Sequence, residues 1–277
     1  MQKIALILRS LATLTVFGVF SLGAVLLGVP VFFLLSLVIR NGRKRCLVLR
    51  GLVKSSFRFI VFLSGIMFVF RVHFRDVEDE KDSAATSDRS MSSSSGRGRI
   101  YISNHPTLVD YVILLTHTEV TVNTMVKHSL TVGFMRHIIN HLGYVNNLSS
   151  LDEVSSSLEN GDSLLIFPEG SRTHGDICFK RGAANLASRL DMDIVPIFIY
   201  CSEPEYLSRG FLNIMAPKHV PHFYIERHRP IKVSDMVPED NLPPAVRARH
   251  LNRYLEKMYR EKIPELKSAC DEGRAGF

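Results

Sequence analysis

The chain has 277 residues, with 34 Lys and Arg against 27 Asp and Glu, which gives a formal net charge of +7 at pH 7. A basic excess suits a protein that rests on anionic lipid headgroups or receives an acidic carrier. We disfavour a nucleic-acid-binding protein, because the basic residues cluster beside apolar segments and no stacking-aromatic or finger pattern accompanies them. The four cysteines form no Cys-x-x-Cys pair and have no histidine at metal-ligand spacing, so neither a metal site nor a disulfide framework is indicated.

The N-terminal part of the chain is apolar. No residue from 10 to 39 is charged. A helix of about 20 apolar residues is long enough to span a bilayer. The sequence therefore predicts a membrane anchor over residues 1–75, with a transmembrane span or a re-entrant hairpin at about 10–39. Glycines and a proline in the second half of this segment leave both forms open. A second apolar segment at about 57–74 is short for a span and predicts an interfacial helix.

Basic residues follow the first apolar segment, whereas only Lys3 and Arg9 precede it. If the segment crosses once, the positive-inside rule places the downstream chain in the cytoplasm, on a bacterial-type inner (cytoplasmic) membrane. The alternative is a cleaved signal peptide, which we disfavour because no compact cleavage site is followed by a polar mature start. The basic residues that follow the first apolar segment are Arg40, Arg43, Lys44, Arg45, Arg50, Lys54 and Arg58.

The sequence of residues 76–277 predicts a linker and one catalytic domain. Residues 76–98 are rich in Asp, Glu, Ser, Gly and Arg, which is typical of a flexible polar linker. Strand and helix patterns then alternate over residues 99–200. We therefore expect residues 99–277 to form an α/β domain, with a mixed sheet flanked by helices. A terminal helix is expected over residues 245–263, with its apolar positions in the core.

The string NHPTLVD, residues 104–110, follows a predicted strand at 99–103. We expect Thr107 to cap a helix that begins near residue 108, which would place the Asp110 carboxylate close to the imidazole of His105. A carboxylate that accepts a hydrogen bond from histidine fixes its tautomer and leaves the other ring nitrogen to take a proton. The alternative is that His105 lies in a turn and forms a hydrogen bond with a backbone group. In a chain with 11 histidines, an Asp five residues after a His is expected by chance.

The string FPEGSRT, residues 167–173, follows an apolar predicted strand at 163–167. Its cation, its two hydroxyl groups and its glycine suit a phosphate or a developing oxyanion. The alternative is a polar loop with an internal ion pair between Glu169 and Arg172. The sequence of this turn thus indicates an anion site beside the predicted base.

Together the two strings resemble the signature of the glycerolipid acyltransferases, the lysophospholipid acyltransferase family typified by bacterial 1-acylglycerol-3-phosphate acyltransferase. Residues 104–110 match the first motif of the family, residues 167–172 match the third and residues 195–197 match the fourth. The resemblance covers residues 100–200. It implies a membrane-bound enzyme that moves an acyl chain from acyl carrier protein or coenzyme A to the hydroxyl of a lysophospholipid.

The resemblance also implies roles for individual residues. His105 would be the general base and Asp110 would orient its ring, with direct attack on the thioester and no acyl-enzyme. Nothing in the sequence resembles a nucleophile elbow or a Cys–His pair. Apart from the thioester co-substrate, no cofactor or metal is expected, and the partners are membrane lipids and the thioester carrier. The residues expected to bind the acceptor are Glu169, Gly170, Ser171, Arg172, Lys127, Lys180 and Arg181, although a solvated surface pair is the alternative for the last two.

The second motif departs from the family pattern. Members that use lysophosphatidate usually carry an Asp-Arg pair after a glycine, and the Arg is taken to grip the acceptor phosphate. Here the stretch is LGYVNNL, residues 142–148, with Asn146 and Asn147 at or near those positions. Neutral amides bind phosphate less strongly than a guanidinium does. The alternatives are therefore an acyltransferase for a glycolipid, amino lipid or pigment lipid, or a non-catalytic lipid- or carrier-binding module, against which the intact catalytic pair speaks.

Overall fold

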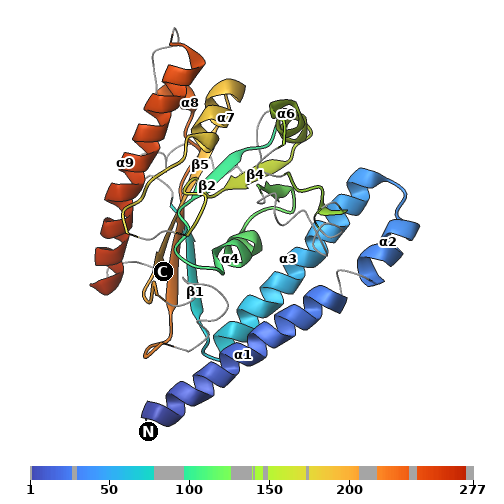
Figure 1. Ribbon diagram of the computed structural model, residues 1–277, viewed down its shortest axis with the longest axis vertical. Helices are drawn as coiled ribbons and strands as arrows, with labels where there is room; N and C mark the ends of the chain where they lie inside the picture. The colour runs from blue at the N-terminus through green and yellow to red at the C-terminus, as the bar shows by residue number, and fades with distance from the viewer. Residues whose placement is uncertain are drawn as a thin grey trace, which may run out of the picture. The chain divides into compact units, whose positions relative to one another are not determined.

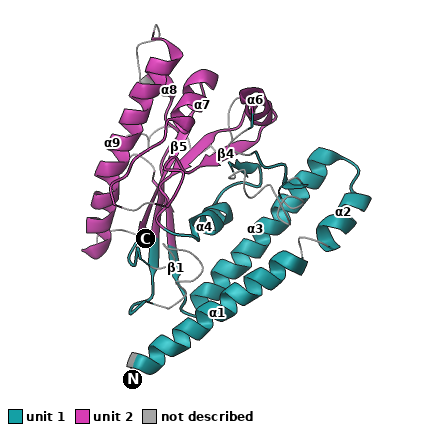
Figure 2. Ribbon diagram, viewed as in Figure 1, with its two compact units in different colours: residues 1–72, 107–149, 201–223 teal, residues 73–106, 150–200, 224–277 magenta. Residues whose placement is uncertain are grey.

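The chain divides into two compact units, each built from segments that are far apart in the sequence (Figure 2). The first comprises residues 1–72, 107–149 and 201–223, and the second comprises residues 73–106, 150–200 and 224–277. The units therefore do not follow the predicted division at residues 76–98. The computed structural model describes residues 2–26, 30–77, 97–125, 139, 141–145, 149–172, 175–205, 217–236 and 242–272 (Figure 1).

The second unit holds most of the sheet. β2 pairs in parallel with both β4 and β5, whereas an isolated antiparallel bridge joins Ile194 to Ile231. All residues of β2 and β4 are buried, which explains why these strands are continuous apolar runs rather than alternating ones. The predicted α/β class with a mixed sheet is thus confirmed. The strands that lie wholly or mostly in this unit follow the order β1-β6-β5-β2-β4, namely β1 (Arg71–Asp76), β6 (His222–Arg227), β5 (Ile194–Cys201), β2 (Ile100–Ser103) and β4 (Ser163–Ile166).

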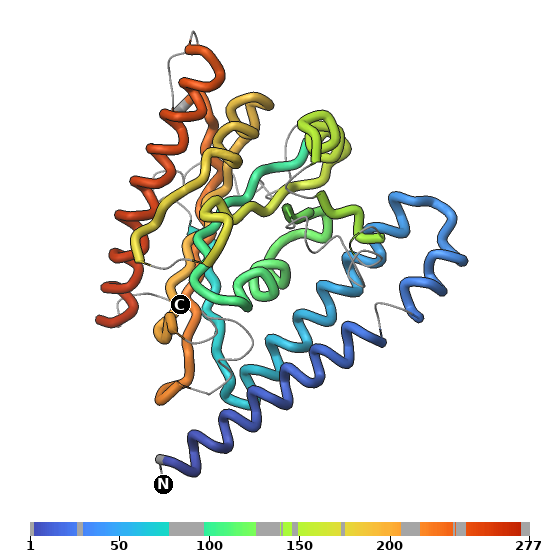
Figure 3. The backbone as a smooth tube through the Cα atoms, viewed as in Figure 1, coloured from blue at the N-terminus to red at the C-terminus, as the bar shows by residue number. Residues whose placement is uncertain are grey.

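Helices flank these strands. Ser150 and Glu153 form a capping box, in which each side chain accepts a hydrogen bond from the backbone N–H of the other residue. The terminal helix is longer than residues 245–263 and includes Pro264. It packs alongside α7, as the tube drawing shows (Figure 3). The helices are α6 (Leu151–Glu159), α7 (Gly182–Leu190), α8 (Val233–Met236) and α9 (Pro244–Asp271).

Tyr259 of α9 forms hydrogen bonds with two parallel strands, β2 and β5. Its side chain is fully buried, and its ring packs against those of Phe179 and Phe198, with centroids 5.0 and 4.5 Å away. Its hydroxyl donates to the carbonyl of Ile102 at 2.7 Å and accepts from the N–H of Ile197 at 3.2 Å. The hydroxyl therefore satisfies buried backbone groups of both β2 and β5.

The first unit contains helices from the predicted anchor together with later segments. α3 begins after Asn41, whose side chain accepts from the N–H of Lys44 at 3.0 Å, and contacts α1, α2 and α4. The predicted helix at 57–74 is wrong in its bounds, since α3 ends at Ile66 and a strand begins at Arg71. The elements are α1 (Gln2–Leu26), α2 (Phe32–Val38), α3 (Gly42–Ile66), α4 (Asp110–His117) and β3 (Val122–Thr124).

The apolar segment at 10–39, predicted as either a span or a re-entrant hairpin, includes parts of two helices, α1 and α2. Within the described residues, one helical stretch is long and apolar enough to cross a membrane, Lys3–Leu26, and 11% of it is buried. It begins earlier than predicted, and residues 27–29, which separate it from α2, lie outside the described residues. Of the predicted linker, residues 78–96 also lie outside them, whereas Asp76 belongs to β1 and Gly98 is buried against the Asp162 carbonyl.

Replacing Tyr259 by phenylalanine should destabilise the protein. The variant keeps the ring but leaves the Ile102 carbonyl and the Ile197 N–H without this buried partner, which costs about 1–3 kcal/mol. The free energy of unfolding, measured by denaturant titration in detergent, reports the effect. The control is Tyr254→Phe on the exposed side of the same helix, which should change it by less than about 0.5 kcal/mol. Equal values for the two variants would refute the bridging role of the hydroxyl.

Candidate active site

The first motif begins where β2 ends. Asn104 is buried, and its side-chain amide forms two hydrogen bonds with the backbone of Ile199 on β5. The amide nitrogen donates to the Ile199 carbonyl at 2.8 Å, and the amide oxygen accepts from the Ile199 N–H at 2.9 Å. Asn104 thus continues the pairing between the two strands with its side chain. The backbone is free to turn away at His105.

His105 lies against residues of the third motif. Its ring stacks on that of Phe167, with centroids 4.4 Å apart and an interplanar angle of 26°. Its backbone N–H donates to the Glu169 carboxylate at 3.1 Å. Parallel neighbouring strands end at the same edge of a sheet, so β2 and β4 deliver the two motifs to one place. The structure therefore brings together two predicted site residues, His105 of the first motif and Glu169 of the third motif.

Glu169 has a contact that the sequence did not predict. The buried carboxylate accepts from the backbone N–H of His105. The roles indicated by the sequence, acceptor binding or an ion pair with Arg172, stay predictions. Phe167 was predicted only as the end of a strand, yet it supplies the face on which the imidazole rests. An aromatic residue directly before the Pro-Glu-Gly string was the signal that could have revealed this stacking.

Asp110 is the first residue of α4 in the first unit and is fully buried. Its carboxylate accepts hydrogen bonds from the backbone N–H of Thr107 at 2.7 Å and from its hydroxyl at 2.6 Å. The prediction that Thr107 caps a helix beginning near residue 108 is therefore wrong: the cap residue is Val109, and the short Asp110 side chain reaches back to Thr107. The hydrogen bond between the side chains of His105 and Asp110 stays a prediction.

The third-motif turn brings Lys180 to Gly170. Gly170 has a φ of +69°, and its N–H donates to the Phe167 carbonyl at 3.0 Å. The N–H of Lys180 donates to the Pro168 carbonyl at 2.8 Å. A Cβ atom at position 170 would lie 2.7 Å from the ammonium nitrogen of Lys180. The backbone conformation therefore favours glycine, and the side chain of Lys180 lies over the turn.

The other predicted acceptor-binding residues differ in their placement. Ser171 is exposed, Arg172 is half-buried, and Arg181 is exposed at the residue before α7. Lys127 lies outside the described residues, as do Asn146 and Asn147 of the second motif. Within the described residues, no three His, Cys, Asp or Glu side chains are grouped to hold a metal ion.

The buried cysteine of β5 is unsuited to nucleophilic catalysis. Burial raises the pKa of the Cys201 thiol to about 12, so that it is protonated at neutral pH. Burial likewise raises the pKa of Cys270 to about 11. A protonated thiol is a poor nucleophile, and the chemistry of these side chains therefore agrees with direct transfer.

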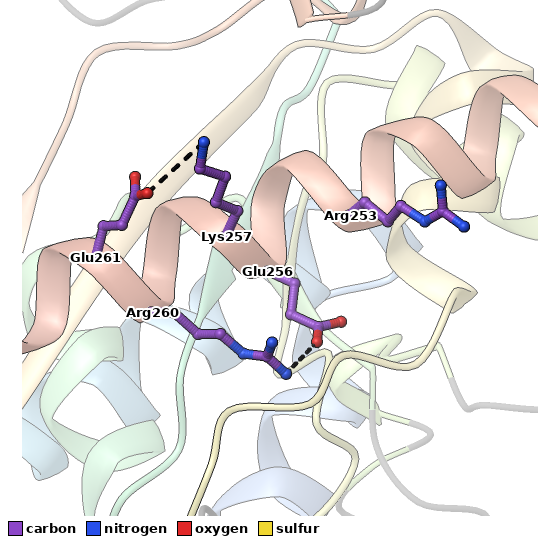
Figure 4. Close-up of a pocket in the computed structure, with 5 residues that line it drawn as sticks. All are labelled: Arg253, Glu256, Lys257, Arg260 and Glu261. Atoms are coloured by element: carbon purple, nitrogen blue, oxygen red, sulfur yellow. Dashed lines mark hydrogen bonds and ion pairs between the residues drawn. The ribbon is translucent and has the colours of Figure 1, made fainter.

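A hollow on the surface of α9 is lined by charged side chains (Figure 4). Arg260 pairs with Glu256 at 2.5 Å, and Lys257 pairs with Glu261 at 3.7 Å; Arg253 completes the lining. Because both acidic side chains are paired one helical turn away, the charges of the hollow largely cancel. We therefore do not place the anion site there.

Replacing Asn104 by alanine should destabilise the protein more than a surface substitution. The variant leaves the N–H and the carbonyl of Ile199 unpaired in the core, which costs on the order of 2–4 kcal/mol. Thermal unfolding followed by circular dichroism measures the loss. Asn185→Ala on the exposed side of α7 is the matched control. If the two variants unfold at the same temperature, the Asn104 amide does not hold β5.

Comparison with known proteins finds two similarities. Residues 87–200 match the model of the family described as Acyltransferase. Among solved structures, the chain is similar to the 1-acyl-sn-glycerophosphate (LPA) acyltransferase PlsC from Thermotoga maritima, with a TM-score of 0.60 and 20% sequence identity, over 96% of this chain and 98% of that one. A search of curated proteins finds no match. The match spans the first, third and fourth motifs, so residues 87–200 are similar to an acyltransferase domain, and the fold of the chain is similar to that of PlsC.

Proposed function

We propose that the enzyme transfers an acyl chain from acyl carrier protein or coenzyme A to the free hydroxyl of a lysophospholipid of the 1-acylglycerol-3-phosphate type. The observation that carries this proposal is the placement of His105, with its backbone on Glu169 and its ring on Phe167. The similar structure from Thermotoga maritima bears the name of a 1-acyl-sn-glycerophosphate acyltransferase, which supports this acceptor.

In the proposed reaction His105 is the general base. One ring nitrogen takes the proton of the acceptor hydroxyl while the hydroxyl oxygen attacks the thioester carbonyl carbon. Collapse of the tetrahedral intermediate breaks the carbon–sulfur bond, and the imidazolium returns its proton to the leaving thiolate. Asp110 orients the ring and stabilises the imidazolium. The stacking on Phe167 limits the rotation of the imidazole and so favours a single reactive orientation.

We place the acceptor phosphate at the turn around Gly170. Lys180 lies over this turn, and its ammonium group supplies three donors to an anion. Glycine allows close approach of the backbone, and the half-buried Arg172 and the hydroxyl of Ser171 follow directly. Arg181 and Lys127 are assigned to the same role by their place in the family pattern.

We further propose that α1 inserts into a bacterial-type inner membrane, with the catalytic residues on the cytoplasmic side. Large apolar side chains of α1 are exposed, and the helix is long enough for a span. Exposed apolar groups of this extent need a lipid or protein cover. These side chains are Ile4, Ile7, Leu8, Leu11, Leu14, Val19, Leu22, Val25 and Leu26.

A second candidate function is transfer to an acceptor without a phosphate. The observation that favours it is the pair Asn146-Asn147 in the second motif, where an Asp-Arg pair is usual for lysophosphatidate. Neutral amides suit the hydroxyls of a glycolipid or the headgroup of an amino or pigment lipid. This candidate keeps the roles of His105 and Asp110 and changes only the acceptor.

Replacing His105 by alanine should lower kcat for acyl transfer to lysophosphatidate by about 10²–10⁴-fold, because the acceptor hydroxyl loses its base. The measurement uses the full-length protein in detergent, with acyl carrier protein and coenzyme A thioesters offered separately. His250→Ala, an exposed histidine on α9, is the control and should retain the wild-type rate.

The outcome of this assay separates the candidates. Unchanged transfer by the His105 variant would refute the general-base mechanism. If the folded wild-type protein transfers no acyl chain to lysophosphatidate from either donor but does acylate a glycolipid, amino lipid or pigment lipid, then the second candidate is correct.

Introducing lysines on the exposed side of α1 should weaken membrane binding. Each lysine at the centre of a span costs about 2.5–3.5 kcal/mol, so the variant with Leu11→Lys and Leu14→Lys should float poorly with phosphatidylcholine vesicles. Phosphatidylcholine vesicles have no net charge, so electrostatic attraction between the added lysines and the headgroups does not mask the loss of apolar binding. Tyr254→Lys on α9 is the control. Flotation of the double variant at the wild-type level would show that α1 is not the membrane-binding element.

A further inference from the structure

Side chains of α9 hold the segment that leads into α7. Arg260 donates twice to the Ile177 carbonyl, from Nε at 3.0 Å and from Nη2 at 2.8 Å. Asn252, which is buried, donates from its side-chain amide to the Phe179 carbonyl at 3.1 Å. Residues 177–179 belong to no helix or strand, so these side chains satisfy backbone carbonyls that have no partner in a regular element.

Glu256 and Tyr259 of α9 contact the same segment. Glu256 accepts from the N–H of Phe179 at 3.4 Å, and its other carboxylate oxygen pairs with Arg260 (Figure 4). The ring of Phe179 packs against that of Tyr259, with an interplanar angle of 65°. Positions 252, 256, 259 and 260 recur at helical spacing, so one side of α9 provides all of these contacts. They lie outside residues 87–200, which match the acyltransferase model.

The residue that follows this segment is Lys180, the cation over the third-motif turn. Its N–H donates to the Pro168 carbonyl at 2.8 Å, and its ammonium nitrogen would lie 2.7 Å from a Cβ atom at Gly170. No carboxylate in the described part of the chain pairs with this ammonium. The backbone of Lys180 is therefore fixed on both sides, by α9 before it and by the turn, while its charge is available to an anion.

The turn that Lys180 contacts also holds the proposed general base. Glu169 lies between the two residues of the turn that Lys180 contacts, and its carboxylate accepts from the N–H of His105 at 3.1 Å. All of these residues, from α9 to His105, belong to the second compact unit. Arg260 is thus connected to the turn beside His105 by hydrogen bonds within one unit.

We propose that Arg260 is a positioning residue for a substrate phosphate: with Asn252 it fixes residues 177–179, so that the Lys180 ammonium stays over the turn and binds that phosphate. The inference rests on the proposed function, in which the acceptor phosphate binds at this turn. The other source of a phosphate is the thioester carrier, because coenzyme A and acyl carrier protein both present a phosphate ester. A lysine is a point charge on a flexible stem, so its affinity for an anion depends on how its backbone is held.

Arg260→Met tests the proposal, because methionine removes the donors to Ile177 and keeps the apolar stem. The Arg260 side chain is 52% exposed, so its replacement leaves the core intact. We expect the KM for lysophosphatidate to rise about three- to ten-fold, with the KM for each thioester within about two-fold of wild type. Arg260→Lys should recover part of the loss, since one cationic donor remains. Arg253→Met removes an exposed arginine of the same helix and should match wild type.

A double-mutant cycle with Lys180→Met separates positioning from general stabilisation. If Arg260 acts through Lys180, then Arg260→Met should change kcat/KM by less than about two-fold once Lys180 is already replaced. Arg260→Met could instead lower kcat/KM by the same factor in both backgrounds, or lower the unfolding temperature without changing either KM. Each of these results would overturn the inference.

The two substrates distinguish this inference from the proposed function. A rise in the KM for the thioester alone, again lost in the Lys180→Met background, would keep the role of Arg260 and assign the phosphate to the carrier. The proposed function fails in a different way, because the wild-type protein would then not acylate lysophosphatidate from either donor. The same cycle is then measured with the acceptor that the protein does acylate, and equal effects in both backgrounds would again overturn the role of Arg260.

Discussion

The candidate site depends on how the backbone groups of β2 and β5 are paired where β2 ends. The Tyr259 hydroxyl lies between the two strands, where it donates to the Ile102 carbonyl and accepts from the Ile197 N–H. Two residues further along β2, the Asn104 amide pairs with both backbone groups of Ile199. Side chains thus satisfy the buried polar groups where the strand ends. The chain leaves the sheet at this point with the Ile102 carbonyl and both backbone groups of Ile199 paired.

Two carboxylates then fix the backbone that follows. Glu169 accepts from the N–H of His105, and Asp110 accepts from the N–H of Thr107. Hydrogen bonds from a backbone N–H to a charged carboxylate are stronger than those between neutral groups. Both acidic residues of the motifs therefore have a structural role in holding the turn, in addition to the catalytic or binding roles that the family resemblance implies.

The N-terminal helices pack against later parts of the chain. α1 exposes apolar side chains along its length, whereas α3 presents Arg50, Lys54 and Arg58 to backbone carbonyls of the same unit. A buried arginine that bonds carbonyls carries a large desolvation cost, which its several hydrogen bonds offset. The N-terminal segment thus supports the helix that begins with Asp110, in addition to the membrane insertion that we propose for α1. These contacts with later segments agree with compact units that do not follow the predicted boundary of the anchor.

The sequence by itself determined the α/β class, the strands that carry the motifs, the capping box of α6 and the similarity to acyltransferases, because these depend on local patterns and short motifs. It did not determine the end of α3, since a segment of apolar and basic residues reads the same whether it lies on a membrane or packs on protein. Nor did it reveal the partners of Arg50, Asn104 and Glu169. These contacts join residues 64 to 95 positions apart, and only the tertiary structure decides which distant carbonyl or N–H meets each side chain.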